Sequence, residues 1–189
     1  MINIIKDKDP IWDVKDYDVV LVGTNVYCMM TNGFQSKIAS MFPDVNEANL
    51  MAGHYGDMRK LGKRLTMYDM TPTVSLLYIC GYPHSKRQFV DYGALERCLA
   101  TANAEFKGKR VMTTMLGTTR FDGNGDRDIV LRIIEENTRN LDLCVYDYEQ
   151  LDKRAERKIV VNTLKEEDYE KYLSMRKNLN EYYKTFYLA

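Results

Sequence analysis

Two loops that contain glycine and precede helices are the parts of this sequence best suited to bind a phosphorylated ligand. The first loop follows the apolar run 19–22, passes through Gly23-Thr24-Asn25 and leads to a helix that opens at Gly33. The second loop spans 116–126 and follows the apolar run 111–115. Backbone N–H groups in such turns point the same way, and the helix dipole adds partial positive charge. If the two strands are parallel, their loops can border one crevice and hold a diphosphate between them.

The pattern of the rest of the chain supplies the elements that would position these loops. Short apolar runs predict strands, and apolar residues at three- and four-residue spacing predict helices. Strands are expected at 2–5, 18–23, 64–68, 74–80, 111–115 and 143–146, and helices after Gly33, Asp91 and Asp126. Asp91 and Asp126 are expected to cap the helices that follow them. This alternation predicts an α/β fold with a mostly parallel sheet.

Each of the three expected helices carries an apolar face. The faces consist of Phe34, Ile38, Met41 and Phe42 in the first helix, of Leu95, Cys98, Leu99, Ala102 and Phe106 in the second, and of Ile129, Val130, Ile133 and Ile134 in the third. Such spacing predicts that each helix packs this side against the sheet. Segment 44–61 is polar and is expected to be irregular, with one short helix around 47–52.

Composition and charge argue against several functional classes. The chain has 189 residues, which suits one domain or one domain with an appendage, and its 27 basic and 27 acidic residues give zero net charge. A dedicated nucleic-acid-binding protein would normally carry a basic excess. No apolar run reaches the ~18 residues of a membrane helix, and the N-terminus lacks a signal-peptide pattern. A cytoplasmic protein with no membrane segment is therefore expected.

The cysteines and histidines do not form a metal-binding pattern. The four cysteines are scattered and lie mostly in apolar segments, as buried free thiols do in a reducing compartment; they are Cys28, Cys80, Cys98 and Cys144. His54 and His84 have no neighbour at ligand spacing. We therefore expect neither a metal nor a cofactor.

Segment 2–150 resembles the macro domains, a family that binds ADP-ribose. Val22-Gly23-Thr24-Asn25 matches the asparagine element that ends a buried strand in that family, and Asn32-Gly33-Phe34 matches its first glycine loop. The segment 116–126 closes with Gly123-Asn124-Gly125-Asp126. It is similar to the second glycine loop of one branch of the family, the ADP-ribose 1''-phosphate phosphatase-like macro domains. The resemblance implies a three-layer α/β/α fold with a mixed, mostly parallel sheet, and ADP-ribose or an ADP-ribosylated substrate as the partner.

The resemblance also implies roles for individual residues. Asp9 would accept a hydrogen bond from the adenine amino group, and Asn25 would bind the hydroxyls of the distal ribose. Gly33 and Phe34 would line the first loop, while Tyr146 and Tyr148, which alternation places on one face, would offer an aromatic ring to adenine. The second loop would contact the diphosphate through Gly117, Thr118, Thr119, Arg120, Gly123 and Gly125.

Whether the chain is an enzyme is left open by these residues. If it is one, the resemblance implies a hydrolase that removes phosphate from ADP-ribose 1''-phosphate or cleaves an ADP-ribosyl linkage. Asn25 would then position the ribose, and Asp126 or Asp122 would handle water or the leaving group. The alternatives are a non-catalytic ADP-ribose-binding module and a macro-like scaffold that acts through its C-terminal helix.

The segment 151–189 is expected to form a C-terminal extension with one long amphipathic helix. Thr163 and Glu166 fit a capping box, and an aromatic-rich stripe follows at helical spacing: Tyr172, Met175, Leu179, Tyr182 and Phe186. This helix is expected to pack on its own domain, to form a homodimer contact through 163–189, or to provide a partner-binding groove.

Overall fold

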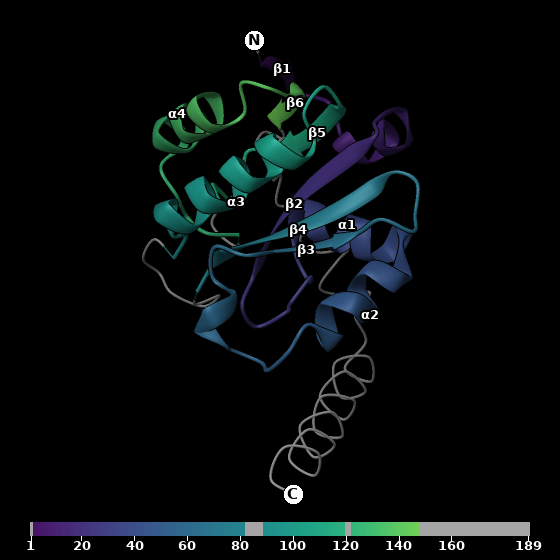
Figure 1. Cartoon of the computed structure of the whole chain (residues 1–189), viewed down its shortest axis with the longest axis vertical. Coiled ribbons are helices and arrows are strands. Elements are labelled where there is room, and N and C mark those ends of the chain that lie inside the picture. Colours follow the sequence, from purple (N-terminus) through teal and green to yellow (C-terminus); the bar gives the residue numbers. More distant parts are fainter. Residues whose placement is uncertain (1, 82–88, 120–121, 148–189) are drawn as a thin grey trace, which may run out of the picture. The chain divides into compact units, whose positions relative to one another are not determined.

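The strands form one sheet in the order β1-β6-β5-β2-β4-β3, with every pairing parallel except that of β3 with β4. The computed structural model describes residues 2–81, 89–119 and 122–147, all within the unit Met1–Glu149 (Figure 1). The strands are β1 (Asn3–Lys6), β2 (Val19–Asn25), β3 (Arg64–Met67), β4 (Thr73–Cys80), β5 (Arg110–Thr114) and β6 (Asp142–Asp147). The expected mixed, mostly parallel sheet is confirmed.

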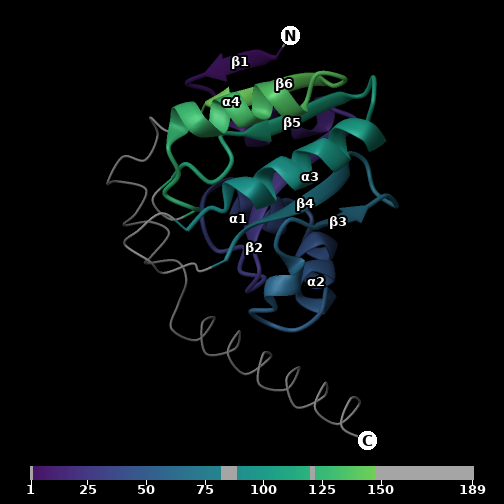
Figure 2. The ribbon, with the colours of Figure 1, turned by 60° about the vertical axis from the view of Figure 1, so that its left-hand side comes forward.

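Helices cover both faces of this sheet, which gives three layers. The helices are α1 (Gly33–Met41), α2 (Pro43–Met51), α3 (Tyr92–Glu105) and α4 (Arg127–Asn137). Helices α3 and α4 lie on one face, and α1 and α2 lie on the other (Figure 2). Single-turn helices follow β1 at Pro10–Trp12 and Val14–Asp16, and precede β3 at Met58–Lys60. The α/β/α architecture follows from strands that are apolar on both faces.

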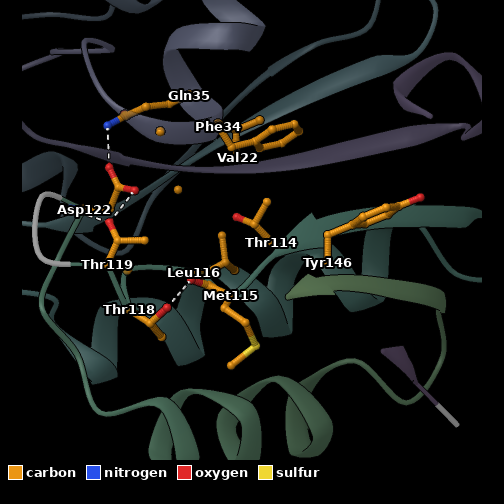
Figure 3. A pocket seen from close by; sticks show the side chains of 13 residues that line it. Val22, Phe34, Gln35, Thr114, Met115, Leu116, Thr118, Thr119, Asp122 and Tyr146 are labelled. Atoms are coloured by element: carbon orange, nitrogen blue, oxygen red, sulfur yellow. Dashed lines mark hydrogen bonds between the residues drawn. The ribbon is translucent and has the colours of Figure 1, made fainter. Parts of the chain in front are cut away.

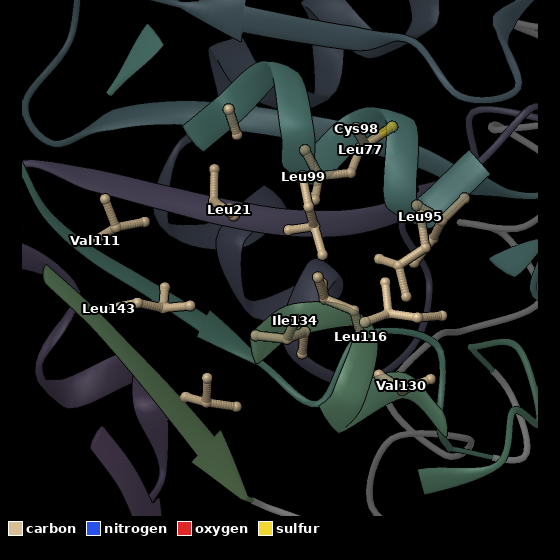
Figure 4. Close-up of a cluster of buried hydrophobic side chains, with 14 of the residues drawn as sticks. Leu21, Leu77, Leu95, Cys98, Leu99, Val111, Leu116, Val130, Ile134 and Leu143 are labelled. Carbon is tan, nitrogen blue, oxygen red and sulfur yellow. The ribbon is translucent and has the colours of Figure 1, made fainter. Parts of the chain in front are cut away.

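The central strand β2 contributes to two separate cores because its side chains alternate between the two faces of the sheet. Leu21 packs with α3 and α4, where Leu95, Leu99 and Ile134 are fully buried (Figure 4). Val20 and Val22 instead join a second cluster that includes Ile38 of α1. Burial on both sides explains why the run is continuously apolar, and it fixes the end of β2 in space.

The position of β2 between β4 and β5 brings the two predicted loops together. Val19 and Val20 pair with Val111 and Met112 of β5, so both strands run in the same direction. Their carboxyl ends therefore lie at the same edge of the sheet. The loop that leads to α1 and the loop that follows β5 both leave from this edge (Figure 1).

The structure corrects the expected helices in three places. Segment 43–51 is one regular helix, α2, that begins at Pro43 immediately after α1. Proline is favoured at the first position of a helix, so the polar composition of this segment was misleading. Met41 is 38 % exposed and Ile129 is 40 % exposed, because each lies at the edge of its apolar stripe. The predicted C-terminal helix, together with His84, lies outside the described residues.

Candidate functional site

One pocket opens at the carboxyl edge of the sheet, between the first turn of α1 and the loop after β5. Its lining comes from the ends of β2 and β5, the start of α1, the second loop and β6: Val22, Gly23, Gly33, Phe34, Gln35, Thr114, Met115, Leu116, Gly117, Thr118, Thr119, Asp122 and Tyr146. Figure 3 shows Gln35, Thr119 and Asp122 grouped at one end and Tyr146 at the other. The pocket is therefore polar at one end and aromatic at the other.

The N-terminus of α1 faces this pocket without a side-chain cap. Asn32 stands at the cap position but makes no capping hydrogen bond, whereas Asp91 and Asp126 cap α3 and α4 through their carboxylates. The first three N–H groups of a helix have no partner within the helix. In α1 they belong to Gly33, Phe34 and Gln35, all of which line the pocket. A ligand in the pocket can thus use donors and a helix dipole that the protein leaves available.

Gly33 allows the second loop to approach the start of α1 closely. Its φ is +55°, and a Cβ at this position would lie 2.8 Å from Oδ2 of Asp122. Any other L-residue here would be strained and would also collide with that carboxylate. Glycine at this position therefore has a reason that does not depend on a ligand.

Asp122 forms a bridge across the pocket between the second loop and α1. Its Oδ2 accepts a hydrogen bond from the Thr119 hydroxyl at 2.8 Å, and its Oδ1 accepts one from Nε2 of Gln35 at 3.1 Å. Burial of the carboxyl group raises the pKa of Asp122 to about 6, although these two hydrogen bonds act in the opposite direction. No described Lys, Arg or His lies within ion-pair distance of it.

The second loop is shaped by close packing around Gly117. This residue has a φ of +70°, and a Cβ there would lie 2.7 Å from Cγ2 of Val90. The N–H of Gly125 donates to the carbonyl oxygen of Gly117 at 2.9 Å, and a Cβ on Gly123 would lie 2.4 Å from that same oxygen. Gly123 and Gly125 therefore support the turn from behind, while Gly117 and Thr118 form its pocket-facing side.

The aromatic end of the pocket is anchored by a hydrogen-bonded cluster. The hydroxyl of Tyr146 donates to Oδ2 of Asp13 at 2.6 Å and lies 3.1 Å from the hydroxyl of Tyr17. Burial is the main cause that raises the pKa of Tyr146 above its usual range and that of Tyr17 to about 12. Lys8 pairs with Asp13, and its hydrogen bond lowers the pKa of that carboxyl. The ring of Tyr146 is thereby held in one position against the pocket.

Comparison with known proteins identifies the fold to which this pocket belongs. No family model matches the chain. A 17.5 kDa protein from the tk–vs intergenic region of Enterobacteria phage T4 is 25 % identical over 135 residues, covering 68 % of this chain and 85 % of the phage protein. The macrodomain of Thermus aquaticus DarG superimposes with a TM-score of 0.58 at 14 % identity, over 78 % of this chain and 98 % of that one. The chain has the macrodomain fold.

A further structural neighbour was solved with a ligand. Thermosipho africanus DarTG in complex with ADP-ribose superimposes with a TM-score of 0.61 at 17 % identity, over 80 % of this chain and 43 % of that one. At such identities the likeness concerns the fold alone. The expected macro-like architecture is confirmed, whereas no comparison distinguishes a phosphatase branch.

The fold brings together most of the second-loop and first-loop residues that the sequence predicts. Gly33, Phe34, Gly117, Thr118, Thr119, Asp122 and Tyr146 all line the pocket. Their roles toward a ligand stay predictions. Arg120 and Tyr148 lie outside the described residues.

Gly123 and Gly125 lie outside the pocket lining, and so do three predicted residues whose side chains have partners within the protein. Asn25 donates from Nδ2 to the carbonyl oxygen of Met29 at 2.9 Å, and its Oδ1 accepts from the N–H groups of Tyr27 and Met29. Asp9 accepts from the N–H of Ile11 and pairs with Lys37 at 2.5 Å. Asp126 caps α4 by accepting from the N–H groups of Asp128 and Ile129. Their predicted roles toward a ligand stay predictions.

Gln35 is the pocket residue that sequence reasoning missed. It lies three positions before Ile38 and so falls on the buried face of α1, with only 6 % of its surface exposed. A polar residue on an otherwise apolar helix face was the available signal, because such a side chain needs partners inside the protein. Among the described residues, no group of three or more potential metal ligands occurs, and no helix is long and apolar enough to cross a membrane.

Proposed function

We propose that this macrodomain binds ADP-ribose, or a group that carries it, in the pocket between α1 and the second loop. The observation that carries the proposal is the convergence of two phosphate-compatible loops on one pocket. The uncapped N-terminus of α1 supplies N–H donors from one side, and the turn at Gly117 approaches from the other. Both features suit an anionic diphosphate placed midway along the pocket.

The two ends of the pocket suit the two ends of such a ligand. The buried rings of Tyr146 and Phe34 form the wall against which a purine ring would lie, and the ring of Tyr146 is already fixed by its hydroxyl. The opposite end, with Asp122 and Gln35, offers hydrogen-bond acceptors to a sugar (Figure 3). Thermosipho africanus DarTG, whose structure was solved in complex with ADP-ribose, lends support to this ligand.

Calorimetric titration of the full chain with ADP-ribose tests the proposal, with AMP as the control. We expect binding in the micromolar range for ADP-ribose and binding at least about tenfold weaker for AMP, because AMP cannot engage both loops. Absence of heat with ADP-ribose at millimolar concentration would overturn the proposal. A function carried by the predicted helix 163–189 would then be the remaining candidate.

We propose hydrolysis as a second candidate function, favoured by the environment of Asp122. A carboxyl group whose pKa is raised to about 6 can exchange a proton near neutral pH, as a general acid or base must. The candidate reactions are removal of phosphate from ADP-ribose 1''-phosphate and cleavage of an ADP-ribosyl linkage, each by water. Turnover that disappears in Asp122→Asn while ADP-ribose still binds would support this role. Equal turnover in the variant would rule it out.

A further inference from the structure

The side chain of Gln35, in the wall at the polar end of the pocket, contains a buried hydrogen-bond acceptor without a described partner. Its Nε2 donates to Oδ1 of Asp122 at 3.1 Å, but its Oε1 is buried and has no hydrogen-bond partner among the described residues. A buried polar atom without a partner is costly and uncommon in folded proteins. Because Gln35 lines the pocket, a hydrogen-bond donor on a ligand can satisfy this atom.

The ionised carboxylate of Asp122 fixes the direction in which the Gln35 amide points. Nitrogen and oxygen of a glutamine amide are exchanged by a half turn, so their assignment follows from their neighbours. A carboxylate only accepts hydrogen bonds, and therefore it faces the amide nitrogen and leaves the amide oxygen turned away. Both oxygens of Asp122 already accept a hydrogen bond, so the Gln35 amide oxygen is the acceptor at this end of the pocket that a ligand donor can satisfy.

This end of the pocket also carries a negative charge that belongs to the protein. Thr119 and Gln35 are neutral donors, and no described cation compensates the carboxylate. The carboxylate moreover lies against Gly33 at the N-terminus of α1, where an anion is favoured by the helix dipole. A phosphate monoester at the same place would add between one and two further charges to a partly buried site.

We propose that Gln35 and Asp122 together act as a specificity determinant for the distal end of the ligand. The pair selects an uncharged ribose whose hydroxyls donate hydrogen bonds, and it disfavours ADP-ribose 1''-phosphate. The inference rests on the proposed binding of ADP-ribose and deepens it by naming the chemistry of the terminal group. If the chain hydrolyses anything, the selected substrates are ADP-ribosyl linkages rather than the phosphate ester.

The preference between the two ligands is measured by titrating the full chain with each ligand separately at pH 7.5. We expect ADP-ribose to bind roughly thirtyfold more tightly than ADP-ribose 1''-phosphate, because like charges and an unmatched acceptor both oppose the phosphate. Phosphate release should be followed in parallel, so that conversion of one ligand into the other is detected. Rapid release of phosphate from the ester would overturn the inference.

Two variants separate the contributions of charge and of the free acceptor. Asp122→Asn removes the charge at nearly constant shape, and we expect the preference to fall to about threefold or less. Gln35→Met keeps the length of the side chain but removes the amide nitrogen and the amide oxygen, and we expect ADP-ribose to bind about five- to tenfold more weakly. Asp142→Asn, at the exposed start of β6, is the matched control and should leave the preference unchanged.

The outcomes distinguish this inference from the proposed function. Equal or tighter binding of ADP-ribose 1''-phosphate by the unmodified chain would overturn the selectivity while leaving ADP-ribose binding intact. Absence of binding by both ligands would overturn the proposed function, and the inference would fall with it. Thermal unfolding of each variant shows whether it is folded, and the preference of the unmodified chain decides the question if either variant is not.

Discussion

Asp122 packs so closely against Gly33 that no side-chain carbon fits between them: a Cβ on Gly33 would lie 2.8 Å from Oδ2 of Asp122 and would force one of the two residues to shift. The contact joins residues from the two loops that form the pocket, and the hydrogen bond from Gln35 to Asp122 reinforces it. The width of the pocket at its polar end is therefore set by packing within the protein.

Replacing Gly33 by alanine should disturb both stability and binding. The positive φ alone costs about 1 kcal/mol, and the collision with Asp122 should raise the loss of unfolding free energy to about 2–3 kcal/mol. Gly108→Ala is a matched control, because Gly108 has a φ of +74° but open space where its Cβ would lie. Urea denaturation should show the smaller loss for Gly108→Ala, and calorimetry should show weaker ADP-ribose binding for Gly33→Ala only. Equal losses in both variants would contradict the close contact.

The buried carboxyl group of Asp122 should make stability depend on pH. Its pKa is about 6 in the folded chain, against the ordinary aspartate value of 3.8 when the chain is unfolded, so the folded state binds the proton more tightly. This contribution is fully present below about pH 4 and is lost as the pH rises through 6. We expect the unfolding free energy of the unmodified chain, relative to Asp122→Asn, to fall by on the order of 2 kcal/mol between pH 4 and pH 7. A constant difference across this range would show that the carboxyl is not buried as described.

Loss of the Asn25 side chain should loosen the loop that follows β2. Its amide makes three hydrogen bonds to the main chain of residues 27 and 29, so we expect Asn25→Ala to lower the unfolding free energy by about 2 kcal/mol without ligand. Asn103→Ala removes one exposed hydrogen bond, to the N–H of Asn140, and should cost clearly less. Chemical denaturation of both variants provides the comparison. An Asn25→Ala variant of unchanged stability, but with lost ADP-ribose binding, would instead assign Asn25 to the ligand alone.

Substitutions of Tyr146 should separate its ring from its hydroxyl. Tyr146→Phe keeps the aromatic surface but removes the hydrogen bonds to Asp13 and Tyr17, which should cost about 1–2 kcal/mol of stability. Its affinity for ADP-ribose should stay within about twofold of the original. Tyr146→Leu removes the ring and should weaken binding about tenfold, if aromatic contact with the base is what the ring supplies. Calorimetry on both variants checks this, and a large loss with Tyr146→Phe would assign the hydroxyl to the ligand.

Sequence periodicity by itself determined the α/β class and the two loops because these depend on local patterns. The unbroken apolar run of β2 required burial on both faces, and the carboxylates of Asp91 and Asp126 marked the first turns of α3 and α4. The glycines at 33 and 117 likewise marked turns that the structure places at the pocket. Each of these features is decided by residues close together in the chain.

The tertiary structure decided which side chains point at the pocket and what each one contacts. Sequence offered Asn25 for the ribose and Asp126 or Asp122 for water or the leaving group, but of these three only Asp122 lies in the pocket lining. Its partner Gln35 lies 87 positions away in the chain, on a different element. Their contact arises because β2 and β5 are neighbours in the sheet and release both loops at the same edge. Side-chain contacts and burial that depend on such long-range pairing are not encoded in any local pattern, and so they appear only once the chain is folded.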